Sequence, residues 1–186
     1  FFMGREIVKK LVAISDVVIA NLPYEDLQKM GIDYDTISAI NPRVILATTS
    51  TFGSEGPYAT RVGFDTIGQA MSGAMFLSGD GKVPTRMNAP FVDFGTALLN
   101  TVGVLAALID RARSGKGQKV ETALLRTAIN ITNSHLIEQA MLSLNRIATL
   151  NRGFTAGPSD TFKCKDGWIY AMAIGQPLFV RWCKVM

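Results

Sequence analysis

Residues 16–49, DVVIANLPYEDLQKMGIDYDTISAINPRVILATT, carry the clearest information about the fold. Its first residues, DVVIA, and its last, RVILATT, are short continuous apolar runs, which are typical of strands buried on both faces. Between them we predict two short helices, one over residues 24–30 that ends at Gly31 and one that Asp33 caps. A strand, helices and a second strand within about 30 residues predict a βαβ crossover and a parallel sheet.

The flanking sequence extends this unit into an α/β protein. We expect a partial Rossmann-like parallel sheet with flanking helices, followed by long linker helices that lead to a second small domain. The expected domain ranges are 1–118, 119–157 and 158–186. Outside the crossover the pattern predicts helices over 5–14 and 65–76, a long helix from 94 to about 114, a strand at 118–122, a second long helix over 123–150 and a strand at 168–174.

Composition excludes several classes of protein. Hydrophobic residues make up 48% of the chain and charged residues 18%, which excludes disorder. The formal net charge of +4 is too small and too scattered for a nucleic-acid surface, although it suits a ligand that carries phosphates. Two cysteines exclude a disulfide scaffold, and a single histidine argues against a zinc site. We therefore expect no bound metal and no nucleic-acid partner.

The longest apolar stretch and the two ends of the chain lead to further expectations. Residues 94–109 contain Thr96 and Asn100 and are shorter than the roughly 20 residues of a bilayer span. We expect a buried helix here and no membrane partner. Both ends of the sequence lie inside helical patterns and no secretory signal precedes the first helix, so we expect an internal piece of a longer cytoplasmic protein.

Asp93 is the candidate for chemistry, and local rules leave two interpretations of it open. It stands immediately before an almost wholly apolar helix, where aspartate is an ordinary N-terminal cap. A carboxylate in that place is also a possible nucleophile. The helix dipole and free N–H groups would hold it ionised while apolar neighbours remove its water. A desolvated, ionised carboxylate is suited to attack on an acyl carbon.

Four segments together resemble the class III CoA-transferases, a family that also includes formyl-CoA transferase, carnitine CoA-transferase and alpha-methylacyl-CoA racemase. These segments are SDVVIANL at 15–22, LQKMGIDYDTISAINPRVILATTSTFG at 27–53, GPYATRVGFDTIGQAMSGAM at 56–75 and VDFGTALLNTVGVLAALIDRARSGKGQKVETALL at 92–125. The resemblance covers essentially the whole chain, and family members are about twice as long. It implies that this chain is part of a larger fold in which two subunits interlock as a homodimer.

The resemblance also implies roles for particular residues. Asp93 falls where the family has its catalytic aspartate. Asn21 and Leu22 match residues that help to hold CoA, and Lys29 and Met30 match residues near its nucleotide part. Arg61 aligns, with a one-residue gap, with a basic residue near the CoA phosphates; a cation there also suits a ligand with several phosphate charges.

One departure from the family pattern bears on the reaction, and another concerns the charge of a single residue. Racemases of the family carry a histidine directly before the aspartate that matches Asp65, and this sequence has Phe64 there. Loss of that acid–base partner favours a transferase. Arg126 also stands where many members have an acidic residue.

The resemblance therefore implies transfer of CoA from an acyl-CoA to a small carboxylic acid, through aspartyl anhydride and aspartyl-CoA intermediates. CoA and acyl-CoA would be substrates, with no permanently bound cofactor. The alternatives are an acyl-CoA racemase or isomerase, and a non-catalytic CoA-binding module.

Overall fold

The computed structural model describes residues 2–186, and side chains from Met3 onward. Its helices are α1 (Phe2–Ile14), α2 (Tyr24–Met30), α3 (Tyr34–Ile40), α4 (Asp65–Met71), α5 (Ala74–Leu77), α6 (Phe91–Ser114), α7 (Leu124–Ile131), α8 (Asn133–Leu142) and α9 (Gln176–Val185). Its strands are β1 (Val17–Ala20), β2 (Ile45–Ser50), β3 (Lys119–Ala123), β4 (Ser159–Lys163) and β5 (Trp168–Met172).

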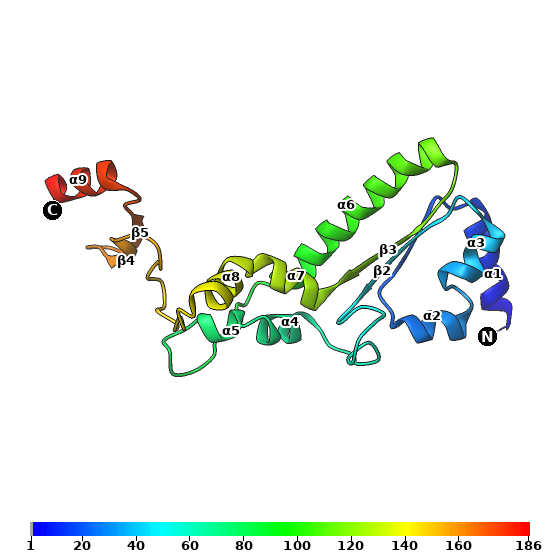
Figure 1. Cartoon of the computed structure of the whole chain (residues 1–186), viewed down its shortest axis with the longest axis horizontal. Coiled ribbons are helices and arrows are strands. Elements are labelled where there is room, and N and C mark those ends of the chain that lie inside the picture. The colour runs from blue at the N-terminus through cyan, green and yellow to red at the C-terminus, as the bar shows by residue number, and fades with distance from the viewer. Residues whose placement is uncertain (1) are drawn as a thin grey trace. The chain divides into compact units, whose positions relative to one another are not determined.

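A three-stranded parallel sheet confirms the expected α/β class. The strand order is β1-β2-β3, with Val17 paired to Ile45 and Leu46 paired to Lys119. Helices α1 and α3 pack on one face, where Val12, Ile37 and Leu46 belong to one buried cluster. Helix α6 lies along β2 and β3 on the other face (Figure 1). The central strand is therefore buried on both faces, as its apolar run predicts.

Local signals in the crossover behave as predicted. Gly31 takes a left-handed conformation, with φ of 69°, and ends α2. The Asp33 carboxylate accepts the Thr36 N–H and caps α3. Outside the crossover, Gly115, with φ of 74°, ends α6 in the same way, at the limit expected for the long helix. Each of these signals depends on a few neighbouring residues, which is why the sequence alone can reveal it.

Three expectations about single elements are wrong. Strand β1 is not buried on both faces, because the described elements leave one face of it uncovered and Ile19 is 77% exposed. The helix expected over 123–150 is divided at Thr132 and ends at Leu142, since Ser143 adopts φ of 50°. The helix expected over 65–76 is likewise divided into α4 and α5. Apolar periodicity continues through such breaks and does not reveal them.

The chain forms two compact units, whose limits differ from the expected domain ranges. One unit contains the residues up to Ala74 together with Arg86–Leu144, and the other contains Met75–Thr85 with Asn145–Met186. Strand β3 completes the parallel sheet, so the first unit continues past the expected limit at residue 118. In the second unit β4 and β5 pair as an antiparallel hairpin, and the Phe162 ring packs 5.5 Å from that of Trp182 on α9. The sequence did not predict β4.

Helix α6 is less buried than expected. Its buried side chains are those of Val92, Thr96, Asn100 and Ala107, and its other faces are largely exposed within this chain. Of the helices in the described part of the chain, α6 alone is long and apolar enough by length and composition to cross a membrane. It nevertheless docks on the sheet through polar groups, because the Asn100 amide donates to Thr49 Oγ1 (2.8 Å) and Thr122 Oγ1 (3.1 Å).

Candidate active site

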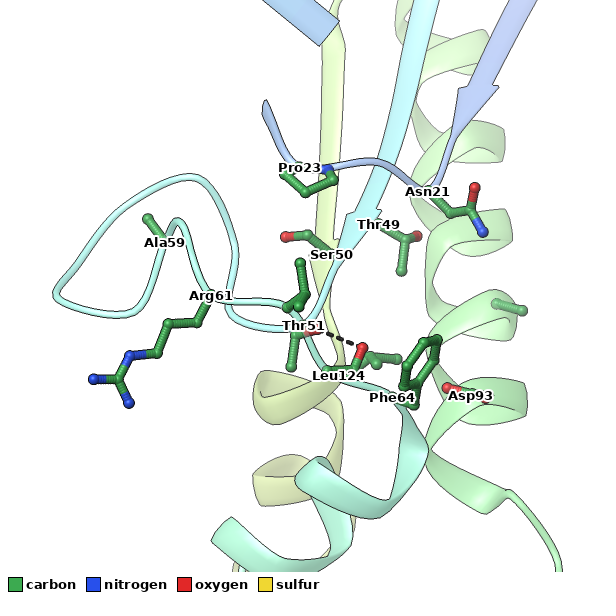
Figure 2. Close-up of a pocket in the computed structure, with 13 residues that line it drawn as sticks. Asn21, Pro23, Thr49, Ser50, Thr51, Ala59, Arg61, Phe64, Asp93 and Leu124 are labelled. Atoms are coloured by element: carbon green, nitrogen blue, oxygen red, sulfur yellow. Dashed lines mark hydrogen bonds between the residues drawn. The ribbon is translucent and has the colours of Figure 1, made fainter. Parts of the chain in front are cut away.

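A cavity of about 440 Å³ opens at the carboxyl ends of β1 and β2 (Figure 2). Ligands of open parallel sheets bind at this end, where the loops after the strands diverge. The volume lies within the usual range for small-molecule sites. The lining residues come from the end of β2, from the loops after β1 and β2 and from the first turns of α6 and α7: Asn21, Pro23, Thr49, Ser50, Thr51, Ala59, Arg61, Val62, Gly63, Phe64, Asp93, Ala97 and Leu124.

Asp93 lies in this cavity, but it does not cap the helix. Helix α6 begins at Phe91, so Asp93 is in its first turn, and the residue at the N-cap position, Pro90, makes no capping hydrogen bond. The backbone N–H groups of Val92 and Asp93 donate instead to Asp65 Oδ2, at 2.9 and 3.2 Å. The interpretation of Asp93 as an N-cap is therefore wrong. Its carboxylate is left available to the cavity.

Asp65 is a residue of this site that sequence reasoning missed. It is 7% exposed and accepts a third hydrogen bond from Gln69 Nε2, at 2.5 Å. Gln69 also bonds the backbone of Met87, on the segment that leads into α6. Asp65 thus fixes the first turn of α6 from another helix. An acidic residue at the start of α4 is the only local signal, and it does not reveal a partner 27 residues away.

The pKa of Asp93 is raised above its ordinary value. Partial burial is the larger cause, and the negative charge of Asp65 is the second. The expectation that free N–H groups hold Asp93 ionised is therefore wrong, because those groups serve Asp65. The partial desolvation expected for the Asp93 carboxylate is present. A carboxylate with a raised pKa is a stronger base and nucleophile once it is ionised.

Arg61 lines the same cavity on the loop between β2 and α4. Its guanidinium lies 4.5 Å from the centre of the Tyr58 ring, and that ring packs against Phe52 at 5.3 Å. Thr51 Oγ1 donates to the Gly63 carbonyl at 2.7 Å and closes the base of the loop. In Figure 2 the Arg61 side chain extends away from Asp93. A ligand that reaches both residues must therefore be long, with an anionic part remote from its reacting part.

The other predicted binding residues are distributed over separate places. Asn21 lines the cavity with Asp93, whereas Leu22 lines a neighbouring small cavity that also includes Glu121. Met30 lines a third cavity beside α1. Lys29 is largely exposed and pairs with Asp26 at 3.1 Å. The structure thus brings Asn21, Arg61 and Asp93 together, and leaves Lys29 and Met30 outside their cavity.

A charged cluster on β3 lies beside the loop that carries Arg61, and sequence reasoning missed it. Burial of Glu121 opposes its ionisation, but hydrogen bonds from Lys119 and Ser54 and the Lys119 charge outweigh this and lower the pKa of Glu121 to about 2. Arg126 Nη2 lies 3.4 Å from Glu121 Oε1. The unusual cation at residue 126 therefore has a partner in this acid. Within the described residues, no group of three His, Cys, Asp or Glu side chains could hold a metal ion.

Comparison with known proteins identifies the family. The model of CoA-transferase family III matches residues 3–186. The chain is 31% identical to a succinate–glutarate CoA-transferase of Agrobacterium fabrum, over 98% of this chain and 46% of the relative. It is also 31% identical to an acyl-CoA transferase of Fusarium pseudograminearum, over 98% of this chain and 40% of the relative.

Comparison with solved structures shows that the fold is also similar to that of known proteins. A CaiB/BaiF family protein from Brucella suis superposes with a TM-score of 0.83 at 35% identity, covering 89% of this chain and 44% of that one. The Rv3272 protein of Mycobacterium tuberculosis superposes with a TM-score of 0.84 at 25% identity, covering 100% of this chain and 49% of that one. The chain belongs to CoA-transferase family III, and it spans less than half the length of these relatives.

Proposed function

We propose that the protein transfers CoA from an acyl-CoA thioester to a small carboxylic acid, with Asp93 as the nucleophile. One observation carries this proposal: a partly desolvated carboxylate of raised pKa lines a cavity at the carboxyl ends of parallel strands. Family membership supports it, as do relatives whose names describe CoA transfer between acids. CoA fits the geometry as a long ligand, with its thioester at Asp93 and phosphates towards Arg61.

The chemistry needs no net proton transfer. An Asp93 carboxylate oxygen attacks the thioester carbonyl carbon, the C–S bond breaks, and CoA leaves as its thiolate from an enzyme-bound mixed anhydride. The thiolate then attacks the Asp93 carbonyl carbon, which releases the donor acid as carboxylate and leaves CoA on Asp93. The acceptor carboxylate reverses both steps. Because attack requires the ionised form, the raised pKa of Asp93 increases its nucleophilicity while setting a lower limit on the working pH.

The position of Phe64 favours a transferase over a racemase. Phe64 lines the cavity with Asp93, and Figure 2 shows its ring beside that carboxylate. A racemase removes and returns a proton at the α-carbon and needs a second acid–base group there, which a phenyl ring cannot supply. A non-catalytic CoA-binding module is the remaining alternative, and the experiment below separates it from an enzyme.

The exposed side of α6 supports assembly with a second copy of the chain as an interlocked homodimer. Large apolar side chains at spacings of three and four residues form a stripe along the helix that other described elements leave uncovered. Its members are Phe94 (68% exposed), Leu98 (69%), Val102 (61%), Leu105 (54%) and Ile109 (69%). A stripe of this kind marks an interface, and it continues from the turn that carries Asp93. We propose that the dimer acts in the cytoplasm, without a nucleic-acid or membrane partner.

Asp93→Asn tests the function. We expect the variant to lose CoA transfer between an acyl-CoA and a carboxylate acceptor, measured by chromatography of the CoA esters. It should unfold at the same or a higher temperature than the wild type at pH 7. The reason is that a carboxyl group whose pKa is raised by folding destabilises the folded state above that pKa, and the amide removes this cost.

Trapping supplies the positive evidence. Hydroxylamine added during turnover should inactivate the wild type and leave a hydroxamate at Asp93, detected by mass spectrometry of the peptide. Asp110→Asn, on the same helix but outside the cavity, is the matched control and should transfer normally. Near-normal transfer by Asp93→Asn would exclude Asp93 as the nucleophile. Binding of CoA by the wild type without any turnover would favour the non-catalytic module.

A further inference from the structure

Strand β3 presents a charged pair on the sheet face opposite α6. Side chains alternate along a strand, and Val120 and Thr122 face α6. A Cβ added to Gly103 of α6 would lie 2.6 Å from Val120 Cγ1, and Asn100 of α6 donates to Thr122. Lys119 and Glu121 therefore share the other face, where Lys119 Nζ lies 2.8 Å from Glu121 Oε2.

Glu121 holds the loop of residues 50–63, which carries Arg61. Its carboxylate accepts the Ser54 N–H at 3.1 Å and the Ser54 hydroxyl at 2.5 Å. The loop backbone lies directly against these charges: a Cβ added to Gly53 would be 3.1 Å from Glu121 Oε1 and 2.6 Å from Arg126 Nη2. Gly53 also has φ of 90°, so another residue there would be strained as well as crowded. The position of the loop backbone at Gly53 and Ser54 is therefore constrained by the position of the Glu121 carboxylate.

Through Lys119, the Lys119–Glu121 pair also contacts the segment after β1. Its ammonium lies 4.2 Å from the centre of the Tyr24 ring, and it approaches Ser54 Oγ at 3.4 Å. Tyr24 is the first residue of α2, and it directly follows the loop of residues 21–23, which contains Asn21. Two loops from different strands, each with a side chain in the Asp93 cavity, are therefore joined through one ion pair.

We propose that Lys119 and Glu121 are positioning residues that hold the two loops in the arrangement that binds the anionic part of the acyl-CoA. The proposal rests on the proposed function. The pair is mostly buried, with side-chain exposures of 26% and 18%. Its low pKa keeps Glu121 ionised throughout the working range. Removing one partner of a mostly buried pair leaves the other uncompensated, so both loops respond to loss of either charge.

Ser54→Ala and Glu121→Gln test the proposal. Ser54→Ala deletes one hydroxyl and leaves the sheet intact, whereas Glu121→Gln keeps the size of the side chain and removes its charge. Ser38→Ala is the matched control, because that hydroxyl bonds within α3, to the Asp35 carbonyl. Arg61 is the loop's single tryptic site. The rate of cleavage after Arg61 therefore reports loop position without any ligand, and calorimetry with CoA reports binding.

For both variants we expect cleavage after Arg61 to accelerate several-fold, and Kd for CoA and KM for acyl-CoA to rise about tenfold. We expect kcat to change less than twofold and Ser54→Ala to keep the wild-type unfolding temperature. A merely structural role would lower that temperature without separating KM from kcat. Unchanged cleavage in both variants, or faster cleavage with unchanged CoA affinity, would overturn the proposal. A wild type that does not bind CoA would instead refute the proposed function, and cleavage alone would then decide whether the pair holds the loop.

Discussion

Substitution of Asp65 gives a sharp test of the site, because this carboxylate has two separable effects on Asp93. It accepts the first N–H groups of α6 and so fixes the turn that carries Asp93, the proposed nucleophile. Its charge also contributes to the raised pKa of Asp93. Asp65→Ala removes both effects. Asp65→Asn removes the charge but keeps one oxygen that accepts an N–H.

The hydrogen bonds of Asp65 set the free energy of unfolding that Asp65→Ala should lose. Val92 is fully buried, so its N–H would lose its acceptor without gaining water, at a cost of about 1–3 kcal/mol. The bonds that Asp65 accepts from the Asp93 N–H and from Gln69 contribute less to this cost. The Asp93 N–H is partly buried and can reach water, and Gln69 keeps its bond to Met87. A total near 3 kcal/mol lowers the unfolding temperature by about 6–12 °C for a chain of this size. Asp65→Asn should cost about 1 kcal/mol, because one acceptor remains.

The dependence of kcat/KM on pH separates the effect of the Asp65 charge on Asp93 from the effect of Asp65 on the structure of α6. Asp93 must be ionised to attack, so kcat/KM falls as pH drops through its pKa. Asp65→Asn removes a neighbouring negative charge, which lowers the pKa of Asp93, so the acid limb should move to lower pH. Partial burial remains, so the limb should stay above the ordinary aspartate range. The measurements are calorimetric unfolding and kcat/KM for acyl-CoA over the acid range.

The exposed Asp35, in the first turn of α3, provides a matched control. Asp35→Ala should change stability by no more than about 0.5 kcal/mol and leave the acid limb in place. If Asp65→Ala unfolded at the wild-type temperature, Asp65 would not secure the start of α6. An acid limb that stayed fixed or moved to higher pH in Asp65→Asn would refute the electrostatic link between the two carboxylates.

Two further predictions concern charge and assembly. Arg61→Gln and Lys29→Gln should each raise KM for acyl-CoA with little change in kcat, and the effect should weaken at high salt; an unchanged KM in both would show that these cations serve only as solvated surface. In sedimentation, the 186-residue chain should associate or aggregate through its exposed apolar stripe, and Leu98→Glu with Leu105→Glu should reduce this; a folded, soluble monomer of the unmodified chain would contradict the interlocked dimer.

Part of the cavity lining was predictable, because the family resemblance names Asp93, Asn21 and Arg61 and the fold brings these three side chains to one cavity. Lys29 and Met30 carry the same kind of resemblance, yet they lie outside that cavity. A resemblance assigns residues to a ligand without saying which of them share one surface within this chain. The difference is one of geometry, since α2 carries Lys29 and Met30 away from the strand ends.

Elements whose cause is local could be predicted from the sequence. The apolar run that ends in Thr49 predicts β2, Gly31 and Gly115 end their helices through φ above zero, and Asp33 caps α3. Each depends on residues within about four positions, where chain connectivity already brings the groups together. Two such strands with helices between them were enough to predict a parallel α/β sheet.

The long-range contacts of the folded chain determine which carboxylate caps α6 and which lines the cavity. One local interpretation assigned the cap to Asp93, but Asp65, on another helix, accepts the N–H groups instead and leaves the Asp93 carboxylate to the cavity. The same holds for Glu121, whose bonds to Ser54 span 67 residues. A hydrogen bond between distant segments depends on where the whole chain places its donor, and the residues around either partner do not contain that information.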